Sequence, residues 1–339
     1  MLKAVMIGFG GIAQAHKAGY LALEKEGKVK LTAVCDIRKE AFVGKVEINL
    51  KNDAAEGGDF RCYTDFEEML KNEERPDFID ICVPTFLHRD IAVSMLRKGY
   101  NVLCEKPMSL TYRDCLLMLE AEKESGKQLM IAQCLRFFPS YRYLKEVVDD
   151  GRFGKVQSAF FSRLSAPPLW SWENWYMDPA RSGGCLTDMH IHDVDMVRYL
   201  FGEPEAVSCR AASSVCVNDS VQSDFYYGGI PVTAVGDWTL SGMTFQASYR
   251  VDLEKATVVY ENDVVTVYPK DGKEAFCPAM EGPNGYTGEI SYFCDVVSGK
   301  IRNDRNPASS AVRTVKLIEA LRASVERNGE RIAFAEENV

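Results

Sequence analysis

The feature that most constrains the fold is a repeated alternation of short apolar runs with helical segments over the first 135 residues. The apolar runs read KAVMIGF, KLTAVCDI, DFIDICVPT and NVLCEKP, and the helical segments include IAQAHKAGYLALEKEG, HRDIAVSMLRKG and TYRDCLLMLEAEKESG. Continuous apolar strands that alternate with helices are typical of a parallel sheet covered on both faces. We therefore predict an α/β domain over residues 1–135.

The pattern changes after Gly154. The runs KVQSAFFSRLS, PVTAVGDWTLS and MTFQASYRVDL alternate more and are separated by hairpin-like spacers. They predict an α+β domain over residues 136–339, with a mostly antiparallel sheet. Two domains also agree with a length of 339 residues. The helical C-terminal segment is a candidate to pack back on the first domain.

A glycine-rich turn, GFGGIA, follows the first predicted strand and opens the first helix. Gly8, Gly10 and Ala13 fit the dinucleotide-binding pattern, in which the pyrophosphate meets free N–H groups at a helix N-terminus. The residues between them, Phe9, Gly11 and Ile12, belong to the same predicted cofactor site. Asp36 ends the second strand, where a carboxylate accepts hydrogen bonds from the ribose hydroxyls. Asp36 favours NAD over NADP, and Arg38 softens that preference.

Two other strand ends belong to the same predicted crevice, because open α/β sheets bind ligands at the carboxyl ends of their strands. Lys106 follows the run NVLC and precedes a proline, which holds it in an extended or turn conformation. Pro84, Thr85 and His88 follow the run DFIDICV. The alternative for Lys106 is a solvated surface lysine.

The segment DMHIHDVD contains two of the four histidines of the chain. We predict one helix of about four turns that ends near Gly202. On that helix Asp188, His192, Asp195 and Tyr199 share a stripe, and His190 points away from Asp188. A helical zinc site would need histidines four residues apart, so a metal is disfavoured. A structural polar stripe and acid/base chemistry both remain open.

The composition excludes several classes of partner. The net charge is −9 and the chain has no basic stripe, so we expect no nucleic-acid partner. No run of about eighteen apolar residues predicts a membrane span, and the N-terminus lacks the features of a signal peptide, so we expect a cytoplasmic protein. The eleven cysteines include no Cys-x-x-Cys pair, which favours reduced, buried thiols over zinc ligands.

Together these segments resemble the Gfo/Idh/MocA oxidoreductase family, which includes glucose–fructose oxidoreductase and inositol dehydrogenase. The matching residues, in the family's order over about the first 200 positions, are GFGGIA, CDIR, VPTFLH, EKP at 105–107, RFFP at 136–139, and GGCLTDMHIHDVD. The resemblance implies an N-terminal Rossmann domain and a second domain with a large open-faced, mostly antiparallel sheet. It also implies a homodimer or homotetramer formed through the open sheet face.

The resemblance also implies roles for particular residues. Lys106 would contact the reacting hydroxyl and the nicotinamide, and Glu105 would lie near the nicotinamide ribose. Asp188 and His192 match the family's Asp-x-x-x-His pair, although His190 stands where the family commonly has glycine. With His192 as general base and Lys106 stabilising the alkoxide, we expect an NAD-dependent dehydrogenase of a sugar, cyclitol or polyol.

Aromatic side chains in PPLWSWENWYMD are candidates to line the substrate pocket, because aromatic faces suit the C–H faces of sugars. We take Trp172, Trp175, Tyr176 and Arg136 as the substrate-binding candidates. Packing of a loop is the alternative for the aromatic residues, and pairing with an acid is the alternative for Arg136. Two other functions stay open on this scaffold: an NAD-dependent glycosidase, and a sensor that binds dinucleotide and ligand without turnover.

Overall fold

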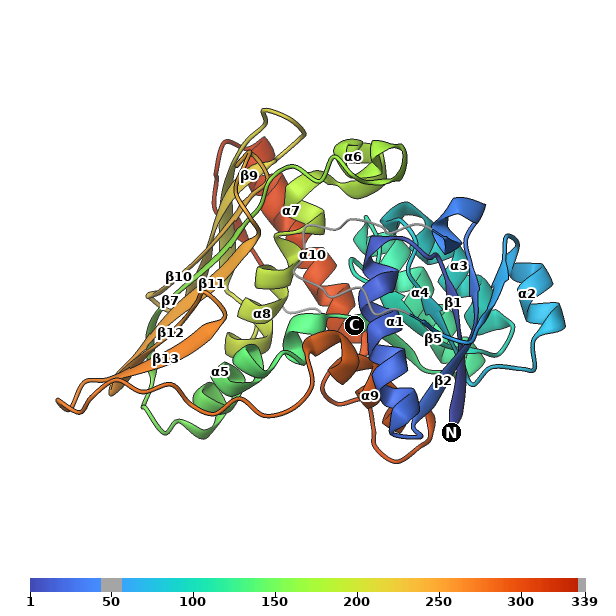
Figure 1. Cartoon of the computed structure of the whole chain (residues 1–339). Coiled ribbons are helices and arrows are strands. Elements are labelled where there is room, and N and C mark those ends of the chain that lie inside the picture. The colour runs from blue at the N-terminus through green and yellow to red at the C-terminus, as the bar shows by residue number, and fades with distance from the viewer. Residues whose placement is uncertain (44–56, 335–339) are drawn as a thin grey trace. The chain divides into compact units, whose positions relative to one another are not determined.

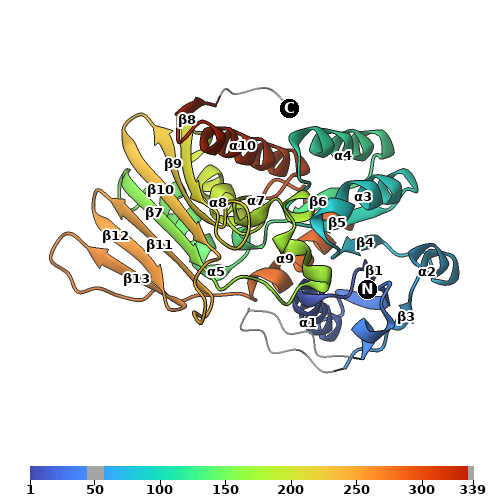
Figure 2. The ribbon, with the colours of Figure 1, turned by 90° about the horizontal axis from the view of Figure 1, so that it is seen from above.

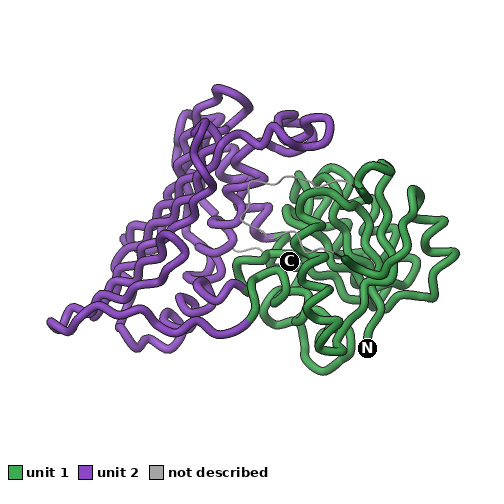
Figure 3. The backbone as a smooth tube through the Cα atoms, viewed as in Figure 1, with its two compact units in different colours: residues 1–137, 283–312 green, residues 138–282, 313–339 purple. Residues whose placement is uncertain are grey.

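The computed structural model describes residues 1–43 and 57–334, which form two compact units (Figure 3). Unit 1 contains residues 1–137 and 283–312, and unit 2 contains residues 138–282 and 313–339. We expected a single division after residue 135. The segment 283–312 belongs instead to the first unit, since its helix contributes Ile290 and Phe293 to the apolar core of that unit.

Unit 1 is built on a six-stranded sheet in which every neighbouring pair is parallel. Its strands are β1 (Leu2–Ile7), β2 (Val29–Cys35), β3 (Arg61–Tyr63), β4 (Phe78–Ile81), β5 (Asn101–Glu105) and β6 (Leu129–Ala132). Their order, β3-β2-β1-β4-β5-β6, is that of a doubly wound dinucleotide-binding sheet. Every residue of β4 and β6 is buried, as the continuous apolar runs predict for a sheet covered on both faces. The prediction of a parallel α/β domain is confirmed.

The helices of unit 1 cover both faces of this sheet, with α3 and α4 on one side and α1 on the other (Figure 2). They are α1 (Gly11–Lys25), α2 (Phe66–Asn72), α3 (His88–Arg97), α4 (Tyr112–Ser125) and α9 (Gly285–Val297), with short 3₁₀ turns η1 (Lys39–Phe42), η2 (Thr85–Leu87) and η3 (Cys134–Arg136). Local sequence fixes several ends: the Thr111 side chain accepts the Asp114 N–H to begin α4, and Gly126 ends it at φ 64°. α9 packs against α1 although more than 250 residues separate them in sequence.

Unit 2 is built on an eight-stranded sheet of order β13-β12-β11-β7-β10-β9-β8-β14. Its strands are β7 (Val156–Leu164), β8 (Ala206–Ala212), β9 (Ser220–Tyr227), β10 (Ile230–Asp237), β11 (Gln246–Leu253), β12 (Ala256–Glu261), β13 (Val264–Pro269) and β14 (Ile332–Ala333). Only β7 and β10 pair in parallel, and the other pairs are antiparallel. Buried side chains alternate along β7 and β10, which is the pattern of a sheet with one covered face. The prediction of a mostly antiparallel sheet is confirmed.

The helices of unit 2 lie on one face of this sheet, and no helix in the described part of the chain covers the other face (Figure 1). They are α5 (Pro139–Asp150), α6 (Pro179–Ser182), α7 (Gly184–Asp188) and α8 (Ile191–Phe201), with the 3₁₀ turn η4 (Trp172–Met177). The long helix α10 (Ala308–Glu326) begins in unit 1 and ends in unit 2. Ser324 on α10 donates to the Cys209 carbonyl of β8 and accepts the Cys209 N–H, so this helix is hydrogen-bonded to β8.

Candidate active site and cofactor site

The turn after β1 requires glycine at its first position. Gly8 has φ +91°, in the region that side-chain-bearing residues rarely adopt, and a Cβ there would lie 2.3 Å from the Cys82 carbonyl oxygen. The Gly8 N–H donates to the Cys35 carbonyl at 2.8 Å, so the turn is held between β2 and the end of β4. This is the tight turn that the GFGGIA motif predicts.

The N-terminus of α1 offers donors to an anion. α1 begins at Gly11, and its N-cap residue Gly10 has no side chain to accept the first N–H groups. Such N–H groups, together with the helix dipole, make a site for a phosphate. Of the residues that the structure describes, a Cβ on Gly10 would meet only the Arg38 guanidinium, at 3.9 Å, so these residues leave space beside the turn for a ligand. Phe9 and Ala13 are buried against the sheet, and Gly11 and Ile12 are half-buried.

Asp36 ends β2 beside this turn. The Phe9 N–H donates to its Oδ2 at 2.9 Å, and the Arg38 guanidinium donates to both of its oxygens at 2.9 Å. Burial on its own raises the pKa of Asp36, but the hydrogen bonds from Arg38 and Phe9 outweigh burial and lower the pKa below its usual value. Asp36 is therefore an ionised acceptor at neutral pH, and Arg38 places a cation directly beside it.

The ends of β4 and β5 are joined by His88. Its Nδ1 lies 2.8 Å from the Pro107 carbonyl and its Nε2 lies 2.9 Å from the Val83 carbonyl. The ring is almost wholly buried, and burial lowers its pKa. Thr85 is buried and Pro84 half-buried in the turn between these strand ends. His88 therefore links the segment after β4 to the segment after β5 through its two ring nitrogens.

Lys106 follows the last residue of β5 and is half-buried, and its peptide bond to Pro107 is cis. The Lys106 N–H donates to Oε2 of the Glu105 carboxylate, at 3.0 Å. The other oxygen, Oε1, lies 3.0 Å from Nε2 of His16 on α1. The backbone of the candidate catalytic lysine is thus tied to a buried histidine through one carboxylate.

The segment that carries Asp188 and His192 is not one helix. The N–H groups of Met189 and His190 both donate to the Cys185 carbonyl, so the hydrogen-bond ladder skips one residue. α7 therefore ends at Asp188 and α8 begins at Ile191. Our prediction of a continuous helix is wrong at this junction, and the even spacing of 100° per residue does not carry from Asp188 to His192. Interruptions of this kind are frequent at functional sites.

The two histidines of this segment differ in environment. His190 is fully buried, its Nε2 lies 2.9 Å from the Ser223 hydroxyl, and its ring packs on Gly236 of β10. Burial lowers the pKa of His190 to about 3, so it is neutral at all ordinary pH values. His192 is half-buried and Asp188 is buried at the end of α7. His190 is a packing residue of unit 2, and it fills the space over a glycine in the sheet.

The aromatic candidates form a cluster in unit 2. Trp175 stacks on Tyr176 with ring centroids 4.0 Å apart, and Tyr176 meets the buried Trp238 edge-on at 5.9 Å. Arg181 lies over the Trp172 ring at 5.4 Å. Trp175 is buried, whereas Trp172 and Tyr176 are half-buried. Packing thus accounts for Trp175, and the other two retain surface for a ligand.

Arg136 is one of the largest fully buried side chains. Its guanidinium donates to the Arg305 carbonyl at 3.0 Å and to the Ser310 hydroxyl at 2.8 Å, both within unit 1. These contacts fasten the segment before α10 to the core.

Comparison with known families accounts for this arrangement. Residues 2–133 match the description "Oxidoreductase family, NAD-binding Rossmann fold", and residues 141–259 match the "GFO/IDH/MocA C-terminal domain". The chain belongs to the Gfo/Idh/MocA oxidoreductase family. It is accordingly an NAD-binding oxidoreductase, and its two matched regions fall in the two compact units.

Individual relatives within the Gfo/Idh/MocA family are distant. The chain is 29% identical to the inositol 2-dehydrogenase of Rhizobium meliloti over 252 residues, which are 73% of this chain and 70% of the relative. It is 31% identical to the 2,7-anhydro-N-acetylneuraminate hydratase of Escherichia coli over 148 residues, 42% of this chain and only 38% of that relative. A solved levoglucosan dehydrogenase, in complex with NADH and levoglucosan, superposes with a TM-score of 0.81 at 19% identity. That alignment covers 99% of this chain and 100% of the other.

The residues present fit the family's dinucleotide. The uncapped N-terminus of α1, the space beside Gly10 and the ionised Asp36 are suited to the pyrophosphate and ribose of NAD. In the described part of the chain no helix has the length and apolar character needed to cross a membrane.

We expect Gly8→Ala and Gly10→Ala to fail in different ways. Gly8→Ala forces a Cβ onto the Cys82 carbonyl at a left-handed φ, so we expect destabilisation by about 3 kcal/mol or more. Among the described residues, a Cβ at position 10 has no neighbour nearer than the Arg38 guanidinium at 3.9 Å, so Gly10→Ala should fold normally and lose NAD affinity by crowding the pyrophosphate. Thermal unfolding and calorimetric titration with NAD distinguish the two. Normal NAD binding by Gly10→Ala would contradict this placement of the cofactor.

The sequence did not lead us to a buried polar cluster that lies between α1, α9 and the strands β4 and β5. It consists of His16 and Tyr20 on α1, Asp80 in β4, and Glu289 on α9, all fully buried. One signal was visible: Asp80 interrupts the otherwise apolar run DFIDICV, and a charged residue inside a buried strand needs a partner. The partner could not be named, because it lies 64 residues away in sequence.

Proposed function

We propose that this protein is an NAD-dependent dehydrogenase that oxidises a hydroxyl of a sugar, cyclitol or related polyol. One observation carries the proposal: Lys106 lies at the carboxyl end of β5, in the sheet whose first turn and Asp36 form the dinucleotide site. The relationship to an inositol 2-dehydrogenase supports this substrate class.

The proposed mechanism uses three side chains. His192 removes the hydroxyl proton as general base, because imidazole titrates nearest to neutrality. The Lys106 ammonium stabilises the oxygen as negative charge develops on it. Asp188 orients the substrate or the imidazole. A bound NAD would supply the hydride acceptor, and the reverse reduction would use the same three side chains with the protons exchanged.

On the substrate side we propose that Trp172 and Tyr176 present aromatic faces to the carbon skeleton. Both keep exposed surface, whereas Trp175 is buried beneath Tyr176. Glu173 and Asn174, between them, both have positive φ values, of 46° and 53°. Such conformations cost free energy and cluster at ligand sites, which supports a binding role for this loop. The contacts of Arg136 leave it a weaker substrate-binding candidate than either aromatic residue.

A panel of polyols, cyclitols and sugars, assayed by the ultraviolet absorbance of reduced nicotinamide, tests the proposal. Net formation of NADH with one class supports a dehydrogenase. A second candidate is a reaction without net oxidation, favoured by the similarity of 148 residues of the chain to a hydratase. Conversion of a sugar or glycoside with bound NAD and no free NADH would establish that alternative. Tight NAD binding with no turnover of any kind would indicate a sensor.

Asp36→Ser should shift the cofactor preference from NAD toward NADP. The substitution removes an ionised acceptor of the ribose hydroxyls and leaves Arg38 free to meet a 2′-phosphate. A hydrogen bond to a charged group contributes about 1.5–3 kcal/mol, so the Kd for NAD should rise about 10- to 100-fold. The double variant Asp36→Ser/Arg38→Ala should lose the gain in NADP affinity. Unchanged NAD affinity in Asp36→Ser would contradict the ribose role.

We further propose a cytoplasmic homodimer or homotetramer that associates through the uncovered face of the eight-stranded sheet. All eleven cysteines are free thiols and most are buried, in keeping with a reducing compartment. A large antiparallel face without helices suits a subunit interface. A monomeric mass in sedimentation equilibrium would contradict the oligomer.

A further inference from the structure

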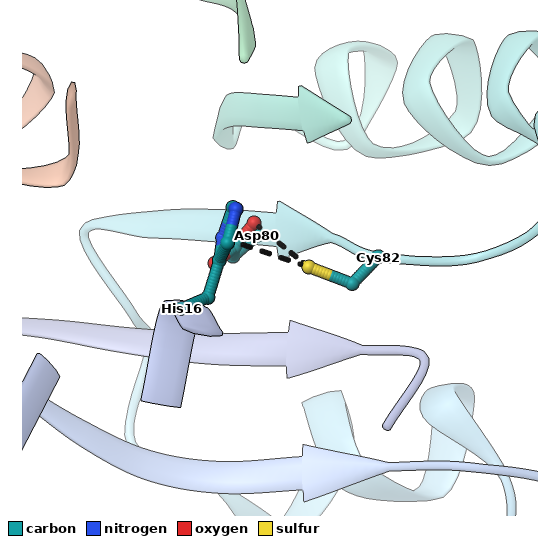
Figure 4. Close-up of side chains that lie close together, drawn as sticks. All are labelled: His16, Asp80 and Cys82. Atoms are coloured by element: carbon teal, nitrogen blue, oxygen red, sulfur yellow. Dashed lines mark hydrogen bonds and ion pairs between the residues drawn. The ribbon is translucent and has the colours of Figure 1, made fainter. Parts of the chain in front are cut away.

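His16 lies at the centre of unit 1 with no exposed surface. Its Nδ1 is 2.8 Å from Oδ2 of Asp80, and Figure 4 shows this contact and the neighbouring thiol of Cys82. Its Nε2 is 3.0 Å from Oε1 of Glu105. The imidazole thus bridges two carboxylates that come from adjacent strands, β4 and β5.

A neutral imidazole cannot satisfy both contacts, because it has one N–H and a carboxylate accepts only. The Tyr20 hydroxyl also donates to Oδ2 of Asp80, at 2.9 Å, which confirms this oxygen as an acceptor. Burial on its own lowers the pKa of His16, but the charge of Asp80 and the adjacent Cys82 raise it well above its usual value. Geometry and charge both favour a doubly protonated ring.

A third carboxyl group faces the same ring from α9. Oε1 of Glu289 is 3.6 Å from Nε2 of His16, and neither Glu289 oxygen has a hydrogen-bond partner among the described residues. Burial raises the pKa of Glu289 well above its usual value; His16 lowers it less, while Glu105 and Asp80 raise it further. Tyr286, also on α9, faces the ring with centroids 6.2 Å apart. With Asp80 and Glu105 already paired to His16, the protonated form of Glu289 is favoured.

We infer that His16 is a positioning residue for the catalytic lysine, holding as an imidazolium the carboxylate of Glu105 that accepts the backbone N–H of Lys106. The chain of contacts is continuous: Asp80 to His16 at 2.8 Å, His16 to Glu105 at 3.0 Å, and Glu105 to the Lys106 N–H at 3.0 Å. Buried charge that is fully paired rigidifies its surroundings. The inference rests on the proposed function where it assigns catalysis to Lys106. The charge state that we infer for the cluster is independent of the proposed function.

Nitrogen-15 NMR of the imidazole side chains tests the charge state directly. Near neutral pH, His16 should show two protonated ring nitrogens, whereas His190, whose pKa burial lowers to about 3, should show one. The His16→Gln variant assigns the signal. Glu105→Gln should weaken or remove the imidazolium signature, because it removes one of the two anions. A neutral His16 in the unaltered protein would overturn the inference.

Kinetics test the positioning role. His16→Gln should lower kcat about 100-fold per folded molecule, since small displacements of a catalytic group have effects of this order, with little change in NAD affinity. Tyr20→Phe is the matched control, because it removes a bond to Asp80 but keeps both contacts of His16. Its kcat should stay close to that of the unaltered enzyme. A purely structural role predicts a lower folded fraction and an unchanged kcat in His16→Gln, and this result would overturn the inference.

The pH dependence of stability tests Glu289. A carboxyl group whose pKa is raised in the folded state stabilises the fold below its unfolded pKa, about 4.3, and that contribution is lost as pH rises. Glu289→Gln has no proton to lose, so its Tm relative to the unaltered chain should climb as pH rises above about 4.3, until Glu289 ionises in the folded state. Glu203→Gln is the control: paired with Arg198 and Arg313, Glu203 has a lowered pKa despite its burial, so that difference should stay flat. If the Tm of Glu289→Gln and the Tm of the unaltered chain changed equally with pH, this part of the inference would be overturned.

One alternative occupant has a distinct signature. His16, Glu105 and Glu289 each present a ligand-type atom within 4.8 Å of the others, so a divalent cation could replace the proton on Nε2. Stoichiometric metal in the purified protein, lost in Glu289→Gln, would overturn the imidazolium. If no polyol reacts, the proposed function fails, while the NMR and Tm series still decide the cluster. If polyols react but His16→Gln keeps kcat, only the positioning role fails.

Discussion

His192→Ala should lower kcat by about 10²- to 10⁴-fold, the usual contribution of a general base, and should leave NAD binding intact. The imidazole is half-buried near the start of α8, whereas the candidate dinucleotide site lies at the ends of β1 and β2 and the start of α1. Steady-state kinetics with the substrate identified by the panel, together with calorimetric titration of NAD, measure the two quantities separately.

His190→Ala is the matched control for that experiment. His190 packs on Gly236 and contacts Ser223, so its removal leaves a cavity and should cost about 1–3 kcal/mol of stability. Its pKa of about 3 excludes a role as a base that becomes protonated during turnover. Per folded molecule, kcat should change little. If His190→Ala abolished turnover in a folded protein and His192→Ala did not, the assignment of the two histidines would be reversed.

Lys106→Ala should lower kcat by about 10²- to 10³-fold, the magnitude seen when one donor to a developing oxyanion is removed. The substitution keeps the backbone N–H that Glu105 accepts, so the end of β5 should stay in place. NAD should still bind, because Asp36 and the N-terminus of α1 are untouched. The loss should therefore appear in kcat rather than in the Kd of NAD.

Lys106→Arg distinguishes charge from shape. A guanidinium keeps the positive charge but distributes it over a planar fork, so we expect partial recovery of kcat relative to Lys106→Ala. Equal losses in the two variants would indicate that the position of the ammonium matters more than its charge. Full activity of Lys106→Ala would remove the lysine from the mechanism and return it to the alternative of a surface residue.

Most of the fold could be predicted because its signals are local. The buried strands β4 and β6 are continuous apolar runs, and the strands of unit 2 alternate as half-buried strands do. The unit boundary was less accessible. Residues 283–312 follow the second domain in sequence, but α9 buries Ile290 and Phe293 against the sheet of unit 1. Periodicity identifies an apolar helix face without naming the surface that covers it.

The same distinction runs through the candidate site. The glycine turn, Asp36 and Lys106 were found because each occupies a fixed offset from the end of a strand. The interruption between α7 and α8 was missed, since no glycine or proline marks it and it arises from two N–H groups that share the Cys185 carbonyl. Uniform helical spacing therefore does not extend from Asp188 to His192, and the role of this pair stays a prediction, whereas His190 is buried against Ser223.

By itself, the sequence determined the doubly wound sheet, the glycine turn at Gly8 and the residue types of the proposed chemistry. Each depends on neighbours within a few positions, so backbone sterics and hydrophobic spacing allow it to be predicted from the sequence. Tertiary structure alone decided that His16, Asp80, Glu105 and Glu289 meet in one buried cluster. Their protonation depends on desolvation and on charges up to 273 residues apart, counting from 16 to 289. Such terms exist only once the chain has excluded water from between them.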